Sequence, residues 1–188
     1  VNEFKYTNYR DKSLYYLGII YNKLGDYKLS RVRLKKLIND YPNSENYGSA
    51  LYWIGESYTA ENNLDEAVNF FKDAISSKRN NTFIDYTIYA LANTYEQMGD
   101  YKNAATYYDE LLTYYRNSPL VSSAQIRIGI CYFKLGDYDS SILELNSQEI
   151  AVLPVDKRSE ALYLLGNSYY RVAEYENAIN TYLSLIKN

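Results

Sequence analysis

The sequence predicts an all-α fold, a right-handed α-solenoid built from antiparallel pairs of helices. A pattern of an aliphatic residue, a small residue, two variable residues and tyrosine occurs five times, at steps of 37 residues. Within each copy the apolar residues lie three and four positions apart, which is the spacing of one helix face. A turn signal, most often Gly-Asp, recurs at the same step and divides each repeat into two helices.

Four columns of residues keep this register through all five copies. The first motif reads Leu17-Gly18-x-x-Tyr21, Ile54-Gly55-x-x-Tyr58, Leu91-Ala92-x-x-Tyr95, Ile128-Gly129-x-x-Tyr132 and Leu165-Gly166-x-x-Tyr169. The turns follow at Gly25-Asp26, Asn62-Asn63, Gly99-Asp100, Gly136-Asp137 and Ala173-Glu174. A small residue comes next at Ser30, Ala67, Ala104, Ser141 and Ala178. The last column is large, with Leu34, Phe71, Tyr108, Leu145 and Tyr182.

The columns place ten helices along the chain and leave no segment that needs a strand. The expected helices are 11–24 and 27–41, 48–61 and 64–79, 84–98 and 101–116, 119–135 and 138–149, and 157–172 and 175–187. Asn63 and Glu66 have the spacing of a capping box at the start of one second helix. In the fourth repeat Gln148 and Glu149 replace apolar residues, so we expect its second helix to end early and the solenoid to bend differently there.

These columns resemble the tetratricopeptide repeat, whose pattern is W-x2-L-G-x2-Y followed by A-x3-F and a proline. The resemblance spans essentially the whole chain, although the unit is 37 residues long and the first aromatic column is mostly aliphatic. The extra residues are expected in the loops that join one repeat to the next. The longer unit resembles bacterial envelope members of the superfamily, such as Tol-Pal-associated periplasmic proteins and lipoproteins of outer-membrane assembly. The resemblance therefore implies a bacterial periplasm or cell-envelope location.

The register also predicts the domain organisation. Residues 1–10 match the end of a preceding repeat, and 11–188 form one solenoid. Its repeats are 11–47, 48–84, 85–121, 122–158 and 159–188. Because both ends fall inside a repeat, we expect this chain to be a piece of a longer array, with further repeats of the same parent chain as neighbours.

Composition argues against several classes of function. The chain has no histidine, which removes the commonest general base and zinc ligand, and its net charge of -3 gives no broad attraction for nucleic acid. Its one cysteine, Cys131, falls in a column of mostly small residues and is interpreted as a filler between helices. No apolar run is long enough for direct membrane insertion. We therefore expect no enzyme, no metal and no cofactor.

The first helices of such an array line its concave groove, where a partner protein or peptide is expected to bind. One groove column holds four tyrosines in five repeats, and the next two columns are polar in the central repeats. The predicted partner-binding residues are Tyr15, Tyr52, Glu56, Tyr89, Asn93, Glu96, Phe133, Tyr163 and Asn167. Tyrosine offers a large rigid contact surface with a hydroxyl. Packing between neighbouring helices, or an ordinary solvated helix face, accounts for the same residues.

The leading hypothesis is a non-enzymatic scaffold for protein–protein interaction that holds a protein or peptide in the groove, with a place in a bacterial cell-envelope assembly. A peptide-sensing regulator, whose solenoid curvature changes on binding a short ligand, is the first alternative. A glycan- or cell-wall-binding module that uses the tyrosines is the second.

Overall fold

The computed structural model describes residues 9–77, 81–153 and 155–187, and in these ranges the chain forms helices joined by turns, with no β-strand. The prediction of an all-α protein built from antiparallel helix pairs is confirmed. The helix end expected at 1–10 falls mainly on residues 1–8, outside the described ranges. The chain divides into two compact units, 1–98 and 99–188, which are described separately.

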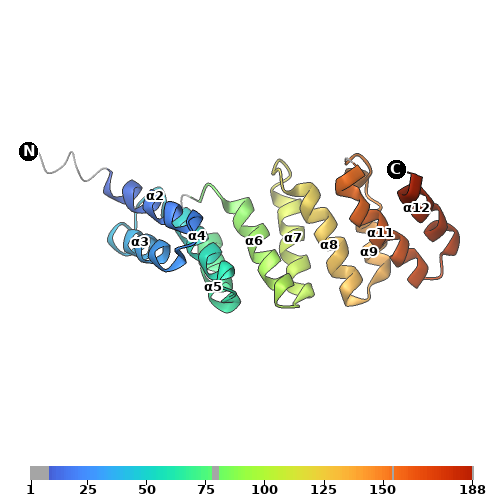
Figure 1. The fold of residues 1–188 in the computed structure, drawn as a ribbon, viewed down its shortest axis with the longest axis horizontal. Coiled ribbons are helices and arrows are strands. Elements are labelled where there is room, and N and C mark those ends of the chain that lie inside the picture. Colours follow the sequence, from blue (N-terminus) through green and yellow to red (C-terminus); the bar gives the residue numbers. More distant parts are fainter. Residues whose placement is uncertain (1–8, 78–80, 154, 188) are drawn as a thin grey trace, which may run out of the picture. The chain divides into compact units, whose positions relative to one another are not determined.

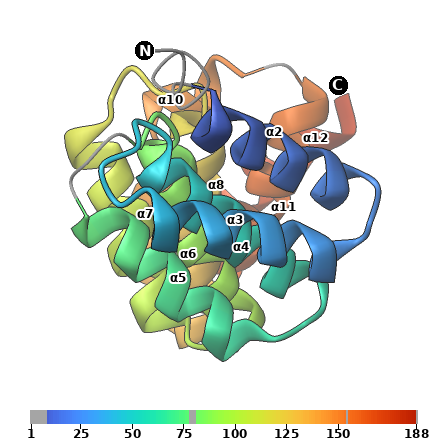
Figure 2. The ribbon, with the colours of Figure 1, turned by 90° about the vertical axis from the view of Figure 1, so that its left-hand side faces the viewer.

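Unit 1 consists of five helices in which each contacts the next along the chain (Figure 1). They are α2 (Arg10–Lys23), α3 (Tyr27–Asp40), α4 (Tyr47–Ala60), α5 (Leu64–Ser76) and α6 (Ile84–Gln97). Helices α2 and α3 run side by side, as Figure 2 shows at the end of unit 1 that faces the viewer. The first helices also contact one another, α2 with α4 and α4 with α6.

Unit 2 contains the remaining helices. They are α7 (Tyr101–Tyr114), α8 (Val121–Leu135), α9 (Tyr138–Leu145), α10 (Gln148–Ala151), α11 (Val155–Arg171) and α12 (Tyr175–Lys187). Helix α7 packs on α8, α8 on α9, and α11 on both α9 and α12. The third repeat contributes one helix to each unit, α6 to unit 1 and α7 to unit 2.

The predicted boundaries agree with the structure to within a few residues. The turns inside a repeat are short, as at 24–26, whereas the connections between repeats are longer, as at 41–46 and 115–120. The extra residues of the 37-residue unit therefore lie between repeats, as expected. The early end of the second helix in the fourth repeat is also confirmed, because α9 stops at Leu145 and a separate short helix follows.

The small column and the large column meet inside each helix pair. In the second repeat a methyl group added to Gly55 would lie 2.5 Å from Cε1 of Phe71, and in the fifth one added to Gly166 would lie 2.5 Å from Cε1 of Tyr182. Glycine is needed here because any side chain would overlap the ring that covers its backbone. The columns read from the sequence therefore describe how the two helices of a repeat fit together.

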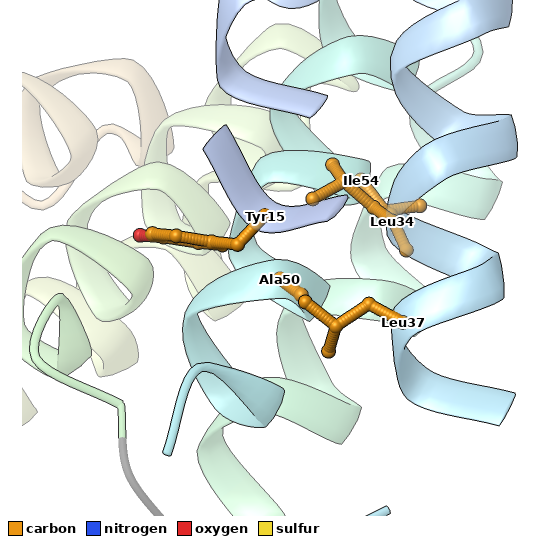
Figure 3. Close-up of a cluster of buried hydrophobic side chains, with 5 residues drawn as sticks. All are labelled: Tyr15, Leu34, Leu37, Ala50 and Ile54. Atoms are coloured by element: carbon orange, nitrogen blue, oxygen red, sulfur yellow. The ribbon is translucent and has the colours of Figure 1, made fainter. Parts of the chain in front are cut away.

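Each unit has its own apolar core. In unit 1 the buried cluster comes from α2, α3 and α4, and it is drawn in Figure 3: Tyr15, Leu34, Leu37, Ala50 and Ile54. A second cluster in unit 2 comes from α9, α10 and α11, and comprises Leu145, Ile150, Ala161 and Leu165. These residues hold successive repeats together through apolar burial.

The turn inside each repeat has the same backbone conformation whichever residue occupies it. Gly136 ends α8 with a φ of 80°, and Asn62 and Ala173 adopt φ values of 60° and 62° at the corresponding positions. The aspartate that follows glycine caps the second helix, as where the Asp137 carboxylate accepts a hydrogen bond from the backbone N–H of Ser140 at 3.1 Å.

The capping box expected at Asn63 is wrong, because the Asn63 side chain makes no capping hydrogen bond in the structure. An amide oxygen carries no net charge, so the positive end of a helix dipole attracts it less strongly than a carboxylate.

Candidate functional site

The residues predicted to bind a partner in unit 1 lie on α2, α4 and α6, the three first helices that contact one another. We call this surface the first-helix face of unit 1. It is formed by Tyr15, Tyr52, Glu56, Tyr86, Tyr89, Asn93 and Glu96. Of these, all but Tyr86 were predicted from the sequence.

Tyr15 and Tyr52 are more deeply buried than a freely accessible aromatic ladder would be, with exposed fractions of 6% and 8%. The Tyr52 ring stacks on Phe83, with centroids 5.4 Å apart and an interplanar angle of 13°. Burial is the largest cause of the raised pKa of both hydroxyls, and for Tyr52 the nearby Glu56 adds to it. In Figure 3 the hydroxyl of Tyr15 points away from the aliphatic cluster. Packing therefore accounts for these two rings.

Glu56 is the most perturbed carboxyl group on this face. It lies on α4, one helical turn beyond Tyr52, and is only partly exposed. Burial raises the pKa of Glu56 to about 7, and a hydrogen bond from the Tyr52 hydroxyl acts in the opposite direction. No basic side chain in the described part of the chain forms an ion pair with it. The face therefore holds a carboxyl group that is desolvated without a compensating cation.

Two basic side chains of α3 reach α4, and both are engaged at its C-terminal end. Arg31 of α3 pairs with Glu61 at 2.7 Å, and its guanidinium carbon lies 4.4 Å from the centre of the Tyr58 ring. Lys35 of α3 donates a hydrogen bond to the Tyr58 hydroxyl at 3.1 Å. Tyr58 is the tyrosine of the repeated motif in the second copy, and its ring stacks on Phe70 of the same repeat. Arg31 and Lys35 of the preceding repeat also lie over the Tyr58 ring. The sequence analysis did not anticipate these cation–π contacts.

The three predicted residues of α6, Tyr89, Asn93 and Glu96, are all half-buried. The sequence analysis missed Tyr86, which lies one helical turn before Tyr89 and is 40% exposed. Tyr86 packs edge to face on Phe83 at 6.1 Å, and it lies close enough to Tyr52 to raise the pKa of that hydroxyl. A sequence signal for Tyr86 existed, because it is a tyrosine one turn away from the groove residue Tyr89. The prediction did not include the column to which Tyr86 belongs.

In unit 2 the predicted residues have mixed roles. Phe133 packs edge to face against Tyr138 at 5.4 Å, and the Asn167 side-chain oxygen accepts a hydrogen bond from Tyr182 at 2.7 Å. Both are therefore already engaged within the unit. Tyr163 is 55% exposed and is the most accessible of the predicted aromatic residues.

The described residues contain no group of three or more potential metal ligands from His, Cys, Asp and Glu. Within the same ranges, none of the helices is both long and apolar enough to cross a membrane. Cys131 is fully buried, in keeping with its interpretation as a filler between helices. What the first-helix face offers is aromatic contact and hydrogen bonding rather than reaction chemistry.

Comparison with known proteins identifies the repeat. Family models described as tetratricopeptide repeat match residues 12–44, 48–81, 89–152 and 160–188, which together make up most of the chain. No curated protein matches the sequence significantly.

Solved structures with a similar fold include MamA, with a TM-score of 0.80 and 16% identity over 96% of this chain and 92% of that one. YrrB, a TPR protein with an unusual peptide-binding site, has a TM-score of 0.76 and 17% identity over 93% and 84%. The TPR-like repeats of a putative kinesin light chain from Podosopora anserina give 0.71 and 15% over 94% and 93%. At these identities the similarity shows the fold alone.

Proposed function

Because the chain belongs to the tetratricopeptide repeat family, we propose that it is a scaffold whose protein or peptide partner docks on the first helices of its repeats. The family is generally non-enzymatic and binds proteins or peptides. The prediction that the chain is not an enzyme agrees with this membership. The peptide-binding site of YrrB, a protein of similar fold, supports a peptide as one kind of ligand.

The observation that carries the proposal is the exposure of aromatic side chains on first helices. Tyr86 on α6 is 40% exposed and Tyr163 on α11 is 55% exposed, although a tyrosine gains stability from burying its ring. Such rings offer contact area that loses little conformational entropy when a partner covers it. Half-buried polar groups beside Tyr86, on α4 and α6, add hydrogen-bonding capacity.

Photo-crosslinking to peptides selected from a random display library tests this proposal. A photoreactive amino acid replaces Tyr86 in one variant and Tyr163 in another, and the controls carry it at the exposed positions Asn69 of α5 and Asn180 of α12. We expect the selected peptides to crosslink at Tyr86, Tyr163 or both, and not at the controls. Crosslinks confined to the second-helix positions would overturn the proposed surface.

We further propose that the parent protein works in a bacterial cell-envelope assembly. The support is the 37-residue unit, which resembles that of envelope members of the superfamily. Fractionation of source cells tests this, because the parent protein is expected with the periplasm or envelope. Recovery in the cytoplasm alone would contradict the location and leave the scaffold proposal standing.

A further inference from the structure

Two pairs of a tyrosine and a glutamate lie on α4 or at its C-terminal cap, and in the described part of the chain only one pair has a cation. At Tyr58 and Glu61, Arg31 of α3 lies over the ring at 4.4 Å and pairs with the carboxylate at 2.7 Å. At Tyr52 and Glu56 the tyrosine hydroxyl donates to the carboxyl group, and none of the described basic residues joins them. The chain thus shows how α4 binds a guanidinium group, and it leaves a second set of the same groups without one.

The distribution of charge in unit 1 favours a cation at the second pair. Helices α4 and α6 contain three carboxylates, Glu56, Asp85 and Glu96, and no lysine or arginine. Helix α3 carries five basic residues, and those that reach α4 contact Ser57, Tyr58 and Glu61. A basic partner would therefore meet complementary charge on the surface of α4 and α6, and like charge on α3 and at the two ends of α2, which carries Arg10, Lys12 and Lys23.

The Tyr52 hydroxyl that bonds to Glu56 lies among other tyrosines. Around this hydroxyl, the ionisable groups of the packed helices are Tyr15 from α2 and Tyr86 and Asp85 from α6. Tyr86 is 40% exposed, so the ring nearest to solvent in this group is accessible to a partner. Aromatic faces attract guanidinium and ammonium groups, and they do so more strongly when water is excluded. A carboxylate beside such a ring can hold a cation by charge and hydrogen bonds together.

We propose that Glu56, with Tyr52 bonded to it and Tyr86 near Tyr52, binds the guanidinium or ammonium group of an arginine or lysine in a basic peptide segment of the partner. This inference rests on the proposed function, because it names the partner chemistry at the first-helix face of unit 1. The raised pKa of Glu56 supports the proposal. Burial makes the ionised form of this carboxyl group unfavourable, and a bound cation would reduce that free-energy cost.

The test uses the full chain and the same random peptide library. The library is selected in parallel against the wild type, Glu56→Gln and the control Glu66→Gln, which removes the same charge from an exposed position on α5. The best peptides are then synthesised with each arginine replaced by citrulline, which has nearly the same shape and no charge. We expect arginine and lysine to be enriched by the wild type and by Glu66→Gln, and not by Glu56→Gln.

In binding assays, we expect the citrulline replacement to weaken binding to the wild type about tenfold and to have little effect on Glu56→Gln. Peptides that crosslink at Tyr86 but show no such coupling would overturn the cation site and leave the proposed function intact. If no peptide crosslinks at a first-helix position, both proposals fail.

A second measurement does not depend on the folding of any variant. Binding of an arginine peptide to the wild type should strengthen as the pH rises from 6 to 8, because Glu56 loses its proton over this range while arginine keeps its charge. The citrulline peptide should show no such change. Equal pH dependence for the two peptides would overturn the proposal.

Discussion

The second and fifth repeats place residues of the same columns in different chemical settings. In the second repeat Gly55 is covered by Phe71, and the following residue, Glu56, depends on Tyr52 for a hydrogen bond. In the fifth repeat Gly166 is covered by Tyr182, whose hydroxyl donates to the following residue, Asn167, at 2.7 Å.

The difference depends on one atom. The rings of Phe71 and Tyr182 approach the two glycines with almost the same geometry, with Cε1 at 2.5 Å and Cζ at 2.9 Å from the position of an added methyl group. Only the tyrosine carries a hydroxyl that can reach the polar residue of the first helix. The second helix therefore decides whether the groove residue is satisfied inside its own repeat or remains available to a partner.

The largest expected effect tests what the two repeats share. Gly55→Val should lower the free energy of unfolding by about 3 kcal/mol, because the fully buried Phe71 ring has no room to move away. Gly166→Val should cost roughly half as much, since Tyr182 is partly exposed and can shift.

Urea unfolding followed by Trp53, the single tryptophan, reports the change in the second repeat, and hydrogen exchange of α11 and α12 reports the change in the fifth. Equal losses in the two variants would mean that burial of the covering ring does not control the cost. A smaller loss for Gly55→Val than for Gly166→Val would contradict the packing described here.

The second-largest expected effect concerns Glu56, the polar residue in which the second repeat differs from the fifth. The pKa of Glu56 is about 7 in the folded chain and near 4.5 in the unfolded one, so the native state binds more protons between these values. The contribution of Glu56 to stability is therefore greatest below pH 4.5, falls as the pH rises, and levels off above about 7. The full difference is at most roughly 3 kcal/mol.

Glu56→Gln should remove this dependence. At pH 8 the variant should be about 2 kcal/mol more stable than the wild type, and near pH 4.5 the two should be nearly equal. Urea midpoints measured through Trp53 at both pH values check the prediction. The exposed Glu66→Gln should follow the wild type at both, and an effect of the same size there would point to net charge instead of burial.

A third substitution gives the second repeat the chemistry of the fifth. Phe71→Tyr should place a hydroxyl close to Glu56, as Tyr182 does at Asn167, and a hydrogen bond to the ionised carboxylate would lower its pKa by about one unit. Titration of the glutamate carboxyl carbons by NMR measures the change. The control is Phe70→Tyr, because Phe70 stacks on Tyr58. An unchanged Glu56 in Phe71→Tyr would show that the two repeats differ in more than the hydroxyl.

The fold could be predicted almost fully because packing in a repeat array is local. Each small residue faces a large one of the same repeat, so a column read along the sequence is also a contact in space. The paired positions even vary together: Asn167 precedes Tyr182 by 15 residues, and Asn93 precedes Tyr108 by the same number. This pattern was a signal for the Asn167 hydrogen bond that the sequence analysis did not use.

The candidate site could be predicted only in part, because exposure and pKa depend on neighbours from other repeats. Tyr52 and Tyr163 occupy one column, yet their exposed fractions are 8% and 55%. Phe83, the N-cap residue of α6, stacks on Tyr52, and Tyr86 of α6 lies near it; neither belongs to a column that the prediction considered. The sequence likewise could not show that Arg31 would take Glu61 as its partner and that Glu56 would have none.

The smallest effect concerns the turns of the same two repeats. Asn62 and Ala173 both have positive φ, at 60° and 62°, and both side chains are exposed. Alanine is disfavoured in this region because its Cβ lies close to the following carbonyl, whereas asparagine is tolerated. Ala173→Gly should therefore stabilise the chain by about 1 kcal/mol, and Asn62→Gly by less than about 0.5 kcal/mol. Thermal unfolding of the two variants beside the wild type measures the difference. A larger gain for Asn62→Gly would show that the turn of the fifth repeat carries no strain, and that Ala173 has the left-handed conformation at no greater cost than asparagine.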